Sequence, residues 1–407
     1  MAIIISLILY TIGGALEAGA INFGMIVGAR VILGMGLGLE GGTVPVYGAE
    51  SVEKKYRGNL VSLYQFMIAF GEVIGYVVAA IFVNVPSGSW RYMLCSSLVF
   101  STIMLVGMLF MPESPRMLLH RGRTLEAFAV WKRIRGLASA EDHKEFFIMH
   151  HALDAEVNEA IVYANIMIAL GQLTGINAIM YYMSTLMSQI GFDKKQSVFI
   201  SLVGGGSLLL GTIPGVLYME KFGRRFWANT MLPCFFVGLI FVGVSYQLNS
   251  VTATEGMYLT GIILYNRFFG SYARLTWVLP SEVFPTYLRS YGMESTDANL
   301  FFGSWLVTYF FSDMQRAMTK TGLTLGVYGG IAVLGWIYQL LFMPETKNKT
   351  LEEIDLIFRQ PTSQLVRKNL RNVTRGMSDI AYFRFGKVFS PTEESHEVEQ
   401  QIQEAKA

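Results

Sequence analysis

Charged residues are scarce in this chain. Asp, Glu, Lys and Arg together make up 15% of its 407 residues, whereas 52% of the residues are hydrophobic. Soluble globular domains carry about 25% charged residues, so one or two ordinary soluble domains are excluded. The mean hydropathy of +0.41 indicates a polytopic membrane protein instead.

Cysteine is also scarce, and the chain has no strong net charge of either sign. The two cysteines, Cys95 and Cys234, both lie in apolar runs, where a free thiol packs as a small hydrophobic group. Neither a disulfide framework nor a zinc site is indicated, and we expect no metal and no cofactor. The net charge of +2 gives no reason to expect a nucleic-acid partner, because the basic residues stand in short connections and form no stripe.

Long apolar runs are abundant. A helix needs about 20 apolar residues to cross the hydrocarbon core of a bilayer. By this criterion ten spans are expected, beginning near residues 2, 22, 59, 91, 161, 197, 226, 257, 290 and 322. The expected fold class is therefore all-α, a polytopic membrane protein of about ten transmembrane helices.

Basic residues gather in alternate connections, which predicts the orientation. Those near residues 54–57, 116–123 and 221–225 fall on one side of the membrane if the spans alternate. The positive-inside rule makes that side cytoplasmic, against which only two pairs run, Lys194 with Lys195 and Arg316 with Lys320. Both termini are then cytoplasmic, in a protein that we expect in the plasma membrane as a monomer.

A repeat divides the chain. The phrase FMPES ends an apolar run at Ser114, and FMPET ends another at Thr346, 232 positions later. Glu50 and Arg57 have counterparts at the same offset in Glu282 and Arg289. Two parallel copies of one helical unit are the architecture of two-halved secondary transporters, whose substrate site lies between the halves. Applied to every span, the offset gives the second copy six helices and the first copy four.

The repeat sets the expected domain boundaries. They are a four-helix N-terminal half at 1–112, a cytoplasmic helical insert at 113–158, a six-helix C-terminal half at 159–346 and a cytoplasmic tail at 347–407. The counterparts of the spans near 161 and 197 would precede residue 1. We therefore expect the chain to lack the first two helices of the complete unit.

Six ordered motifs resemble the signatures of the sugar porter family of the major facilitator superfamily, in the style of fungal hexose, pentose and polyol transporters. They are RVILGMGLGLEGGTVPVYGAESVEKKYRG (30–58), PESPR (112–116), GQLTGINAIMYY (171–182), EKFGRR (220–225), PSEVFPTYLRSYG (280–292) and PETK (344–347). The resemblance covers nearly the whole chain to about residue 356. It implies transport of a sugar or polyol by alternating access, coupled to protons in full-length relatives.

The resemblance also implies substrate-binding residues. Sugars are neutral and rich in hydroxyls, so uncharged amides and an aromatic face suit them. The residues assigned in this way are Gln172, Asn177, Gln65, Trp277, Tyr181, Tyr182 and Asn299. Each amide could instead be a helix-packing residue, since interhelical hydrogen bonds are common in membranes.

A second set of residues predicts a cytoplasmic gate. These acidic and basic side chains stand at cytoplasmic helix ends, where opposite charges can pair when that face closes. The set consists of Glu50, Arg57, Glu113, Arg116, Glu220, Arg224, Arg225, Glu282, Arg289 and Glu345. We expect Glu282 to pair with Arg289; the alternative is that the basic residues merely follow the positive-inside rule.

Charges within the spans are expected to face a cavity or a partner, because a charge at a span centre costs about 2.5 to 3.5 kcal/mol. Glu72 lies on the same helical face as Gln65, seven residues away, and is a candidate for proton coupling. Arg274 could form a salt bridge with Glu294 or Asp297. A drifting sequence with no special role for these three residues is the alternative.

An enzyme is disfavoured, because the spans contain no constellation of nucleophile, base and oxyanion donors. Two readings remain for the function. The motifs favour a carrier for a sugar or polyol, with protons and the lipid bilayer as further partners. The missing helices favour a truncated paralogue without transport activity, a sugar sensor or an incomplete gene model.

Overall fold

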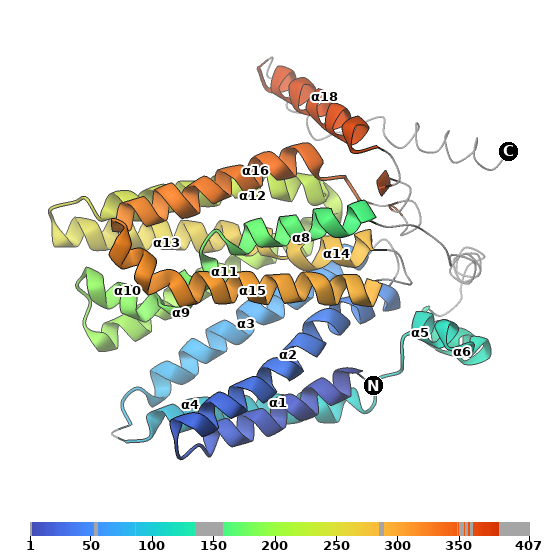
Figure 1. Ribbon diagram of the computed structural model, residues 1–407, viewed down its shortest axis with the longest axis horizontal. Helices are drawn as coiled ribbons and strands as arrows, with labels where there is room; N and C mark the ends of the chain where they lie inside the picture. Colours follow the sequence, from blue (N-terminus) through green and yellow to red (C-terminus); the bar gives the residue numbers. More distant parts are fainter. Residues whose placement is uncertain are drawn as a thin grey trace.

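The computed structural model describes residues 2–52, 56–85, 87–135, 158–284, 289–347, 349, 354, 357–358 and 361–381. Every regular element within these residues is a helix, and the long helices lie side by side in one elongated bundle (Figure 1).

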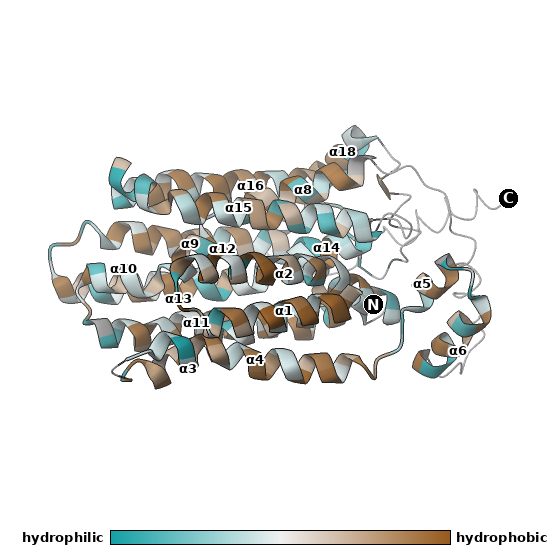
Figure 2. Ribbon diagram, turned by 60° about the horizontal axis from the view of Figure 1, so that its bottom comes forward, coloured by the Kyte–Doolittle hydropathy of each residue, from teal (hydrophilic) through white to brown (hydrophobic). Residues whose placement is uncertain are grey.

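The N-terminal half consists of four long helices. They are α1 (Ala2–Ala18), α2 (Phe23–Ser51), α3 (Arg57–Phe82) and α4 (Ser89–Met108). Helix α2 begins where the Asn22 side chain accepts a hydrogen bond of 2.8 Å from the Met25 backbone N–H, which satisfies one free donor of the first turn. Helix α1 packs against both α2 and α4. Figure 2 shows the mostly apolar residues of α1 and α4 at the edge of the bundle.

Two short helices follow, α5 (Pro115–His120) and α6 (Thr124–Arg135). Pro115 takes the first position of α5, where its missing N–H costs no hydrogen bond. A small separate core of Leu118, Ala127 and Trp131 holds α5 and α6 together. These helices mark one end of the bundle, which we call the insert end (Figure 1).

The C-terminal half contains most of the buried core. Its helices are α8 (Asn158–Gln172), α9 (Ile176–Tyr181), α10 (Met183–Ile190), α11 (Lys194–Phe222), α12 (Arg224–Ser245), α13 (Val251–Ala273), α14 (Leu275–Val283), α15 (Arg289–Ala317), the π-helix η1 (Gly322–Gly329) and α16 (Gly330–Phe342). Helix α18 (Thr362–Ala381) lies beyond them and contacts α16, where Asn369 donates to the Leu341 carbonyl over 2.6 Å.

All ten expected spans begin within a few residues of a helix start. By length and composition alone, seven helices of the described part are long and apolar enough to cross a membrane. The other three expected spans are α1, which is apolar but has 17 residues, and α13 and α15, which carry charged residues. In α15 two of the charged residues, Arg289 and Asp297, are buried against protein, which is where a polar group in a membrane helix is tolerated.

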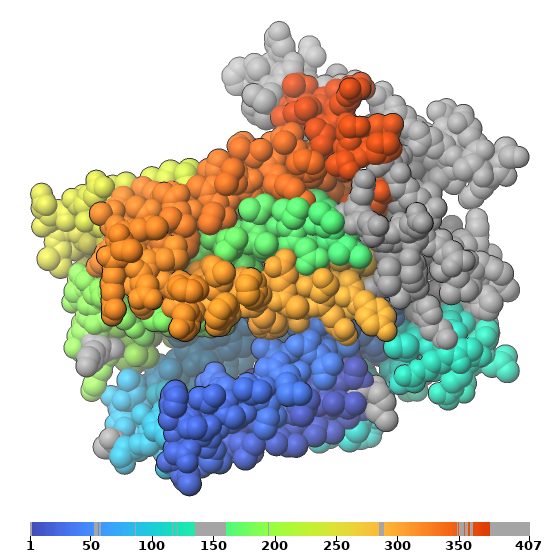
Figure 3. Space-filling view, viewed as in Figure 1, coloured from blue at the N-terminus to red at the C-terminus, as the bar shows by residue number. Residues whose placement is uncertain are grey.

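The two halves meet chiefly along two helix pairs, α3 with α11 and α2 with α15, and α14 also contacts both α3 and α2. Helices α2 and α15 come together toward the insert end and diverge away from it (Figure 1). Figure 3 shows the resulting recess between the two halves, with α3 at its floor. The halves are therefore closed against each other at the insert end.

Glycines allow the closest helix pairs to form. A Cβ atom added to Gly238 on α12 would lie 2.5 Å from the backbone N of Tyr265 on α13. Apart from the adjacent backbone of its own helix, no atom of the described residues lies within 4 Å of the Cβ position of Gly206 on α11. Both glycines are in the middle of a helix, but Gly238 lies against the backbone of another helix, whereas Gly206 has open space beside it.

This difference predicts opposite effects of the same substitution. Gly238→Ala should destabilise the protein by about 1 to 3 kcal/mol, because backbone atoms cannot move aside as side chains do. Gly206→Ala should be neutral, or stabilising by up to about 1 kcal/mol, through its higher helix propensity. Thermal unfolding midpoints of the two variants in detergent would test this, and equal midpoints would contradict it.

Candidate functional site

Four of the predicted substrate residues, Gln172, Asn177, Tyr181 and Tyr182, flank a break between α8 and α9. Residues 173–175 leave the helix, and Gly175 adopts a φ of 88°, in the left-handed region that favours glycine. A Cβ at Gly175 would also lie 2.6 Å from the Tyr328 ring, so glycine is required for two reasons. Broken helices in membranes are tolerated where they line a cavity, and they expose polar groups for binding.

Gln172 and Asn177 stand on the two sides of this break. The Asn177 amide donates to the Gln172 side-chain oxygen over 2.5 Å. This bond uses one acceptor and one donor, and each amide retains further hydrogen-bonding capacity for a hydroxyl. Tyr181 is 66% exposed, whereas the Tyr182 ring stacks on Phe311 at 5.0 Å. The two tyrosines therefore point to different surroundings.

Gln65 and Trp277 form a direct link between the halves. The Trp277 indole N–H on α14 donates to the Gln65 side-chain oxygen on α3 over 2.8 Å. Tyr64 meets the same indole edge-on, with ring centroids 4.8 Å apart. Both Gln65 and Trp277 are buried, so an amide and an aromatic face lie together between α3 and α14.

Asn299 has a packing contact in this structure. Its amide donates to the Asn165 backbone carbonyl over 2.8 Å, which ties α15 to α8 within the C-terminal half. Of the seven assigned substrate residues, Gln172 with Asn177 and Gln65 with Trp277 form two hydrogen-bonded pairs. The Asn299 amide instead bonds to Asn165, which is not one of the seven.

Glu72 lies on the face of α3 that meets the C-terminal half. One turn further along α3, the Tyr76 hydroxyl donates to the Met180 carbonyl of α9 over 3.0 Å. Within the described residues, one carboxylate oxygen of Glu72 is buried and has no hydrogen-bond partner. The expected position on the same face as Gln65 agrees with this arrangement.

The gate residues form a network at the insert end, and both repeats build the same unit. In the first repeat, the Ser114 hydroxyl donates to the Glu50 carboxylate over 2.5 Å. In the second, the Thr346 hydroxyl donates to Glu282 over 2.7 Å. The offset of 232 residues relates both members of the two pairs. In each repeat, the hydroxyl at the end of the terminal proline motif thus anchors the carboxylate of the gate helix that precedes it.

Two contacts of this network join the halves. Arg289 on α15 pairs with Glu50 on α2 at 3.5 Å, and both side chains are buried. The backbone N–H of Gly58 on α3 donates to Glu220 on α11 over 2.9 Å. An unpaired buried charge is costly, so each bond favours closure of the insert end.

The other contacts of the network lie within one half. The Arg224 guanidinium binds Glu220 at 2.7 Å and Glu282 at 2.5 Å. Glu345 accepts hydrogen bonds of 3.0 and 3.1 Å from the backbone N–H groups of Arg224 and Arg225, a favourable place for an anion at the start of α12. Glu113 pairs with Arg121 at 3.4 Å on the surface.

Comparisons with known proteins agree with this architecture. The family model described as "Sugar (and other) transporter" matches residues 1–358. The myo-inositol transporter FST1 of Gibberella moniliformis is 62% identical over 95% of this chain and 72% of its own length. Sugar transport protein 8 of Arabidopsis thaliana is 29% identical over 85% of this chain and 72% of its own length.

This chain belongs to the sugar transporter family. Within that family it is a membrane transporter of sugars or polyols, and not an enzyme. Its fold is that of the major facilitator superfamily. The proton:xylose symporter XylE bound to 6-bromo-6-deoxy-D-glucose matches 88% of this chain and 82% of its own, with a TM-score of 0.79 at 24% identity. The inward-open XylE of E. coli matches the same shares with a TM-score of 0.64 at 24% identity.

The pairing predicted for Glu282 and Arg289 in this transporter is wrong. Among the described residues, Glu282 binds Arg224 and Thr346, whereas Arg289 binds Glu50 and the Phe284 carbonyl. The reason is that each residue has a partner from a third helix. Arg224 of α12 binds Glu282, and Glu50 of α2 binds Arg289.

Two predicted gate residues, Arg57 and Arg116, have side chains outside the described residues. Each stands at or near the first position of a helix, in α3 and α5. Their expected pairing therefore stays a prediction.

Arg274 forms no salt bridge with Glu294 or Asp297. It stands at the junction of α13 and α14, fully buried, with its guanidinium 4.1 Å from the centroid of the Trp227 ring. A Cβ at Gly215 would overlap this guanidinium, so Gly215 provides the space that it occupies. A cation over an indole face is a favourable arrangement in a desolvated site.

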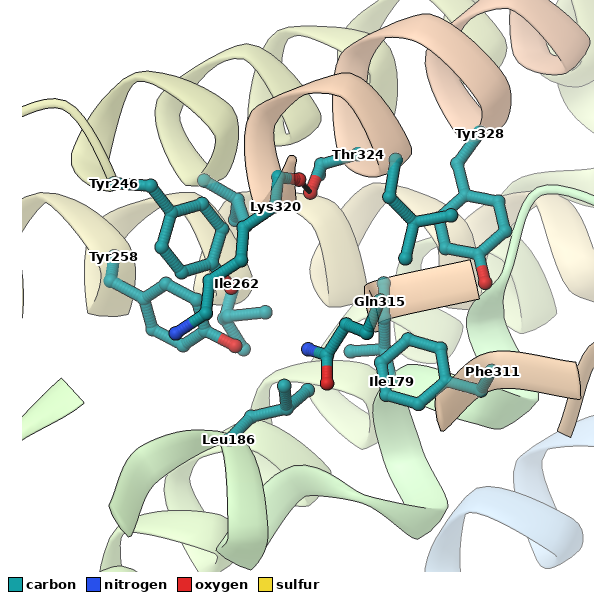
Figure 4. Close-up of a pocket in the computed structure, with 12 residues that line it drawn as sticks. Ile179, Leu186, Tyr246, Tyr258, Ile262, Phe311, Gln315, Lys320, Thr324 and Tyr328 are labelled. Carbon is teal, nitrogen blue, oxygen red and sulfur yellow. Dashed lines mark hydrogen bonds between the residues drawn. The ribbon is translucent and has the colours of Figure 1, made fainter. Parts of the chain in front are cut away.

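A cavity lies at the end of the bundle opposite the insert end, within the C-terminal half (Figure 4). Tyr246, Tyr258, Gln315, Lys320 and Tyr328 line it, and the Lys320 ammonium is 5.4 Å from the centroid of the Tyr246 ring. Its volume of about 20 Å³ is room for about one water molecule, so it cannot hold a sugar.

Sequence reasoning missed several residues of the transporter. The signal for Ser114 and Thr346 was the repeat: they are the last residues of FMPES and FMPET and are related by the offset of 232. Tyr64, beside Gln65, and the Trp227 partner of Arg274 had no comparable signal, because they meet their partners across helices far apart in the sequence.

The cross-half pair predicts a specific rescue. Glu50→Arg and Arg289→Glu should each lower substrate uptake about tenfold or more, a loss of at least about 1.4 kcal/mol, because each leaves like charges facing one another. Combining the two should restore part of the uptake, since the attraction depends on the signs of the charges. Uptake per molecule at the cell surface is the measurement.

The matched control for this rescue is Glu282→Arg combined with Arg289→Glu. These two residues have different partners, so their losses should add. A rescue in the control, or its absence in the Glu50 and Arg289 pair, would show that the network is wired differently.

Proposed function

We propose that this chain carries myo-inositol, or a cyclic polyol or hexose of similar shape, across a membrane by alternating access. The observation that carries the proposal is the 62% identity to a myo-inositol transporter over 95% of the chain. Binding residues placed along several helices are seldom rearranged at that level of identity, which favours a related substrate.

The chemistry of the candidate site suits such a substrate. A cyclic polyol carries no charge, and a hydroxyl group on each ring carbon needs both donors and acceptors. Side-chain amides supply both in one group, and an aromatic face covers the apolar C–H side of the ring. Gln172, Asn177, Gln65 and Trp277 offer these groups from α8, α9, α3 and α14, with Tyr181, Tyr182 and Asn299 as further candidates.

Alternating access requires two bodies that separate at one end at a time. We assign these bodies to residues 1–112 and 159–346, with the insert 113–158 and the tail 347–407 on the same side. The positive-inside rule supports a cytoplasmic insert end with both termini in the cytoplasm. We propose in addition that the protein is a monomer in the plasma membrane. The cross-half bonds at the insert end then correspond to a state closed toward the cytoplasm.

Glu72 is the proposed proton-coupling residue of the substrate path. Its buried carboxylate oxygen has no partner among the described residues, so ionisation there is disfavoured while the halves are closed. Water that enters on opening would solvate the charged form. Binding and release of a proton can in this way follow the opening and closing of the path.

Substrate uptake tests the site directly. Asn177→Ala should abolish saturable uptake of labelled myo-inositol in yeast cells deficient in inositol transport, because it removes an amide beside Gln172. Asn84→Ala provides the matched control, since Asn84 is exposed in the connection between α3 and α4. Normal uptake by Asn177→Ala at equal surface expression would remove Asn177 from the site.

A second measurement separates transport from coupling. Glu72→Gln should remove substrate-driven proton uptake into reconstituted vesicles while exchange of labelled for unlabelled myo-inositol continues, because the amide cannot release a proton. Glu255→Gln on α13 is the control for the same chemical change. Undiminished proton uptake by Glu72→Gln would exclude Glu72 as the coupling group.

A further inference from the structure

A second carboxyl group is buried where α2 crosses α15, on the other contact between the halves. The carboxylate of Asp297 points at the backbone of α2: a Cβ on Gly41 would lie 2.5 and 2.6 Å from its two oxygens. A Cβ on Gly42 would lie 2.7 Å from Cγ of Glu294. The two glycines thus let α2 approach the acidic face of α15 closely, and Glu40 precedes them on α2.

One oxygen of the Asp297 carboxylate has no hydrogen-bond partner among the described residues. Asp297 is 3% exposed, and its Oδ1 atom is buried without a hydrogen bond to any described residue. A buried carboxylate without a donor or a cation is one of the most costly groups in a protein, and such a group becomes neutral instead. Glu40 and Glu294 act on Asp297 with the same sign of charge, which increases that cost.

The basic groups on the surrounding helices are engaged elsewhere. Arg289, on the same helix as Asp297, binds Glu50 and the Phe284 carbonyl. Arg30, on the same helix as Glu40, pairs with Glu17 of α1. Arg224 of α12 binds Glu282 of α14.

The other polar neighbours are uncharged or are acids. Tyr10 of α1 lies within electrostatic range of Glu40, and Tyr64 of α3 within range of both Glu40 and Asp297. On α8, Asn165 bonds to Ser295 and Asn299 of α15. Tyr181 of α9 lies within electrostatic range of Glu72. Within the described residues, the cluster therefore has no cation to balance it.

We propose that Asp297, together with Glu40 and Glu294, is a proton-binding site shared by the two halves, which holds a proton while the insert end is closed and releases it when that end opens. The equilibrium is the ordinary one of a carboxylic acid with its carboxylate and a proton. The proton passes to water that enters between α2 and α15.

The position of the cluster along the helices supports this coupling. Glu50 lies ten residues beyond Glu40 on α2, and Arg289 lies eight residues before Asp297 on α15. At 1.5 Å per residue, the ion pair is about 12 to 15 Å nearer to the insert end than the carboxyl cluster. Breaking that pair would therefore open the contact of α2 with α15 from the insert end, first at Gly42 and Glu294 and then at Asp297.

The site is distinct from Glu72, which faces α9 from α3. The inference rests on the proposed alternating access, because it needs an insert end that opens. It goes beyond that proposal in naming a proton site. Protonation of this site would set the fraction of molecules in which the insert end is closed, whatever substrate the central site binds.

The test measures the gate without substrate. Spin labels on Val52→Cys and Ser290→Cys, in a background of Cys95→Ser and Cys234→Ser, report the distance between the ends of α2 and α15. Raising the pH from about 5.5 to about 8.5, the range in which buried carboxyl groups titrate, should increase the long-distance fraction at least about twofold. Asp297→Asn, which resembles the protonated acid, should keep the short distance at both pH values.

Two further variants make the result specific. Asp313→Asn is the matched control: it lies on the same helix but is 71% exposed near the opposite end, and it should respond to pH as the parent does. Glu40→Gln should reduce the pH response. No pH response in the parent, or a full response in Asp297→Asn, would overturn the proposal.

The ligand and the dependence on transport can be distinguished in the same experiment. A long-distance fraction that follows sodium chloride against choline chloride, and not pH, would identify a sodium ion and overturn the proton assignment. Failure of myo-inositol uptake with an intact pH response would overturn the proposed substrate and leave the proton site standing.

Discussion

Contact between the two halves of this transporter at the insert end depends on buried charges that cannot remain unpaired. Glu50 meets Arg289 there, and Glu220 accepts the Gly58 N–H, so each half satisfies polar groups of the other. An apolar interface of the same extent would gain from staying closed in any state. A few charge-assisted bonds instead have a definite geometry and are lost together, which suits a contact that has to break and re-form.

The repeat explains how these charges are held in place. A hydroxyl that follows each terminal proline motif binds the carboxylate of the preceding gate helix, Ser114 to Glu50 and Thr346 to Glu282. Beyond this shared unit the halves differ. The second carboxylate is already neutralised within its own half by Arg224, whereas the first depends on Arg289 across the interface. The C-terminal half is thus complete in itself, and the N-terminal half contributes the acceptor that closes the gate.

Much of this arrangement could be predicted from the sequence because it follows from periodicity. Apolar runs gave the positions of the helices, and the offset of 232 residues related Glu50 to Glu282. Pairing partners could not be predicted in this way. Spacing along the chain suggested Glu282 with Arg289, but a partner is chosen by distance between helices, and α12 brings Arg224 closer. The break at Gly175 and the stacking of Arg274 on Trp227 likewise depend on residues far apart in the sequence.

A neutral substrate leaves the task of coupling to the protein's own charges. Glu72 and Asp297 each have one buried carboxylate oxygen with no hydrogen-bond partner in the described part of the chain, but they belong to different interfaces, α3 with α9 and α2 with α15. Separation of the halves at the insert end exposes the second interface first, because the Glu50 and Arg289 pair closes it. Because each interface has its own carboxyl group, a proton can bind or leave at one interface without a change at the other. Closure of the gate and occupancy of the substrate path can then respond to protonation separately.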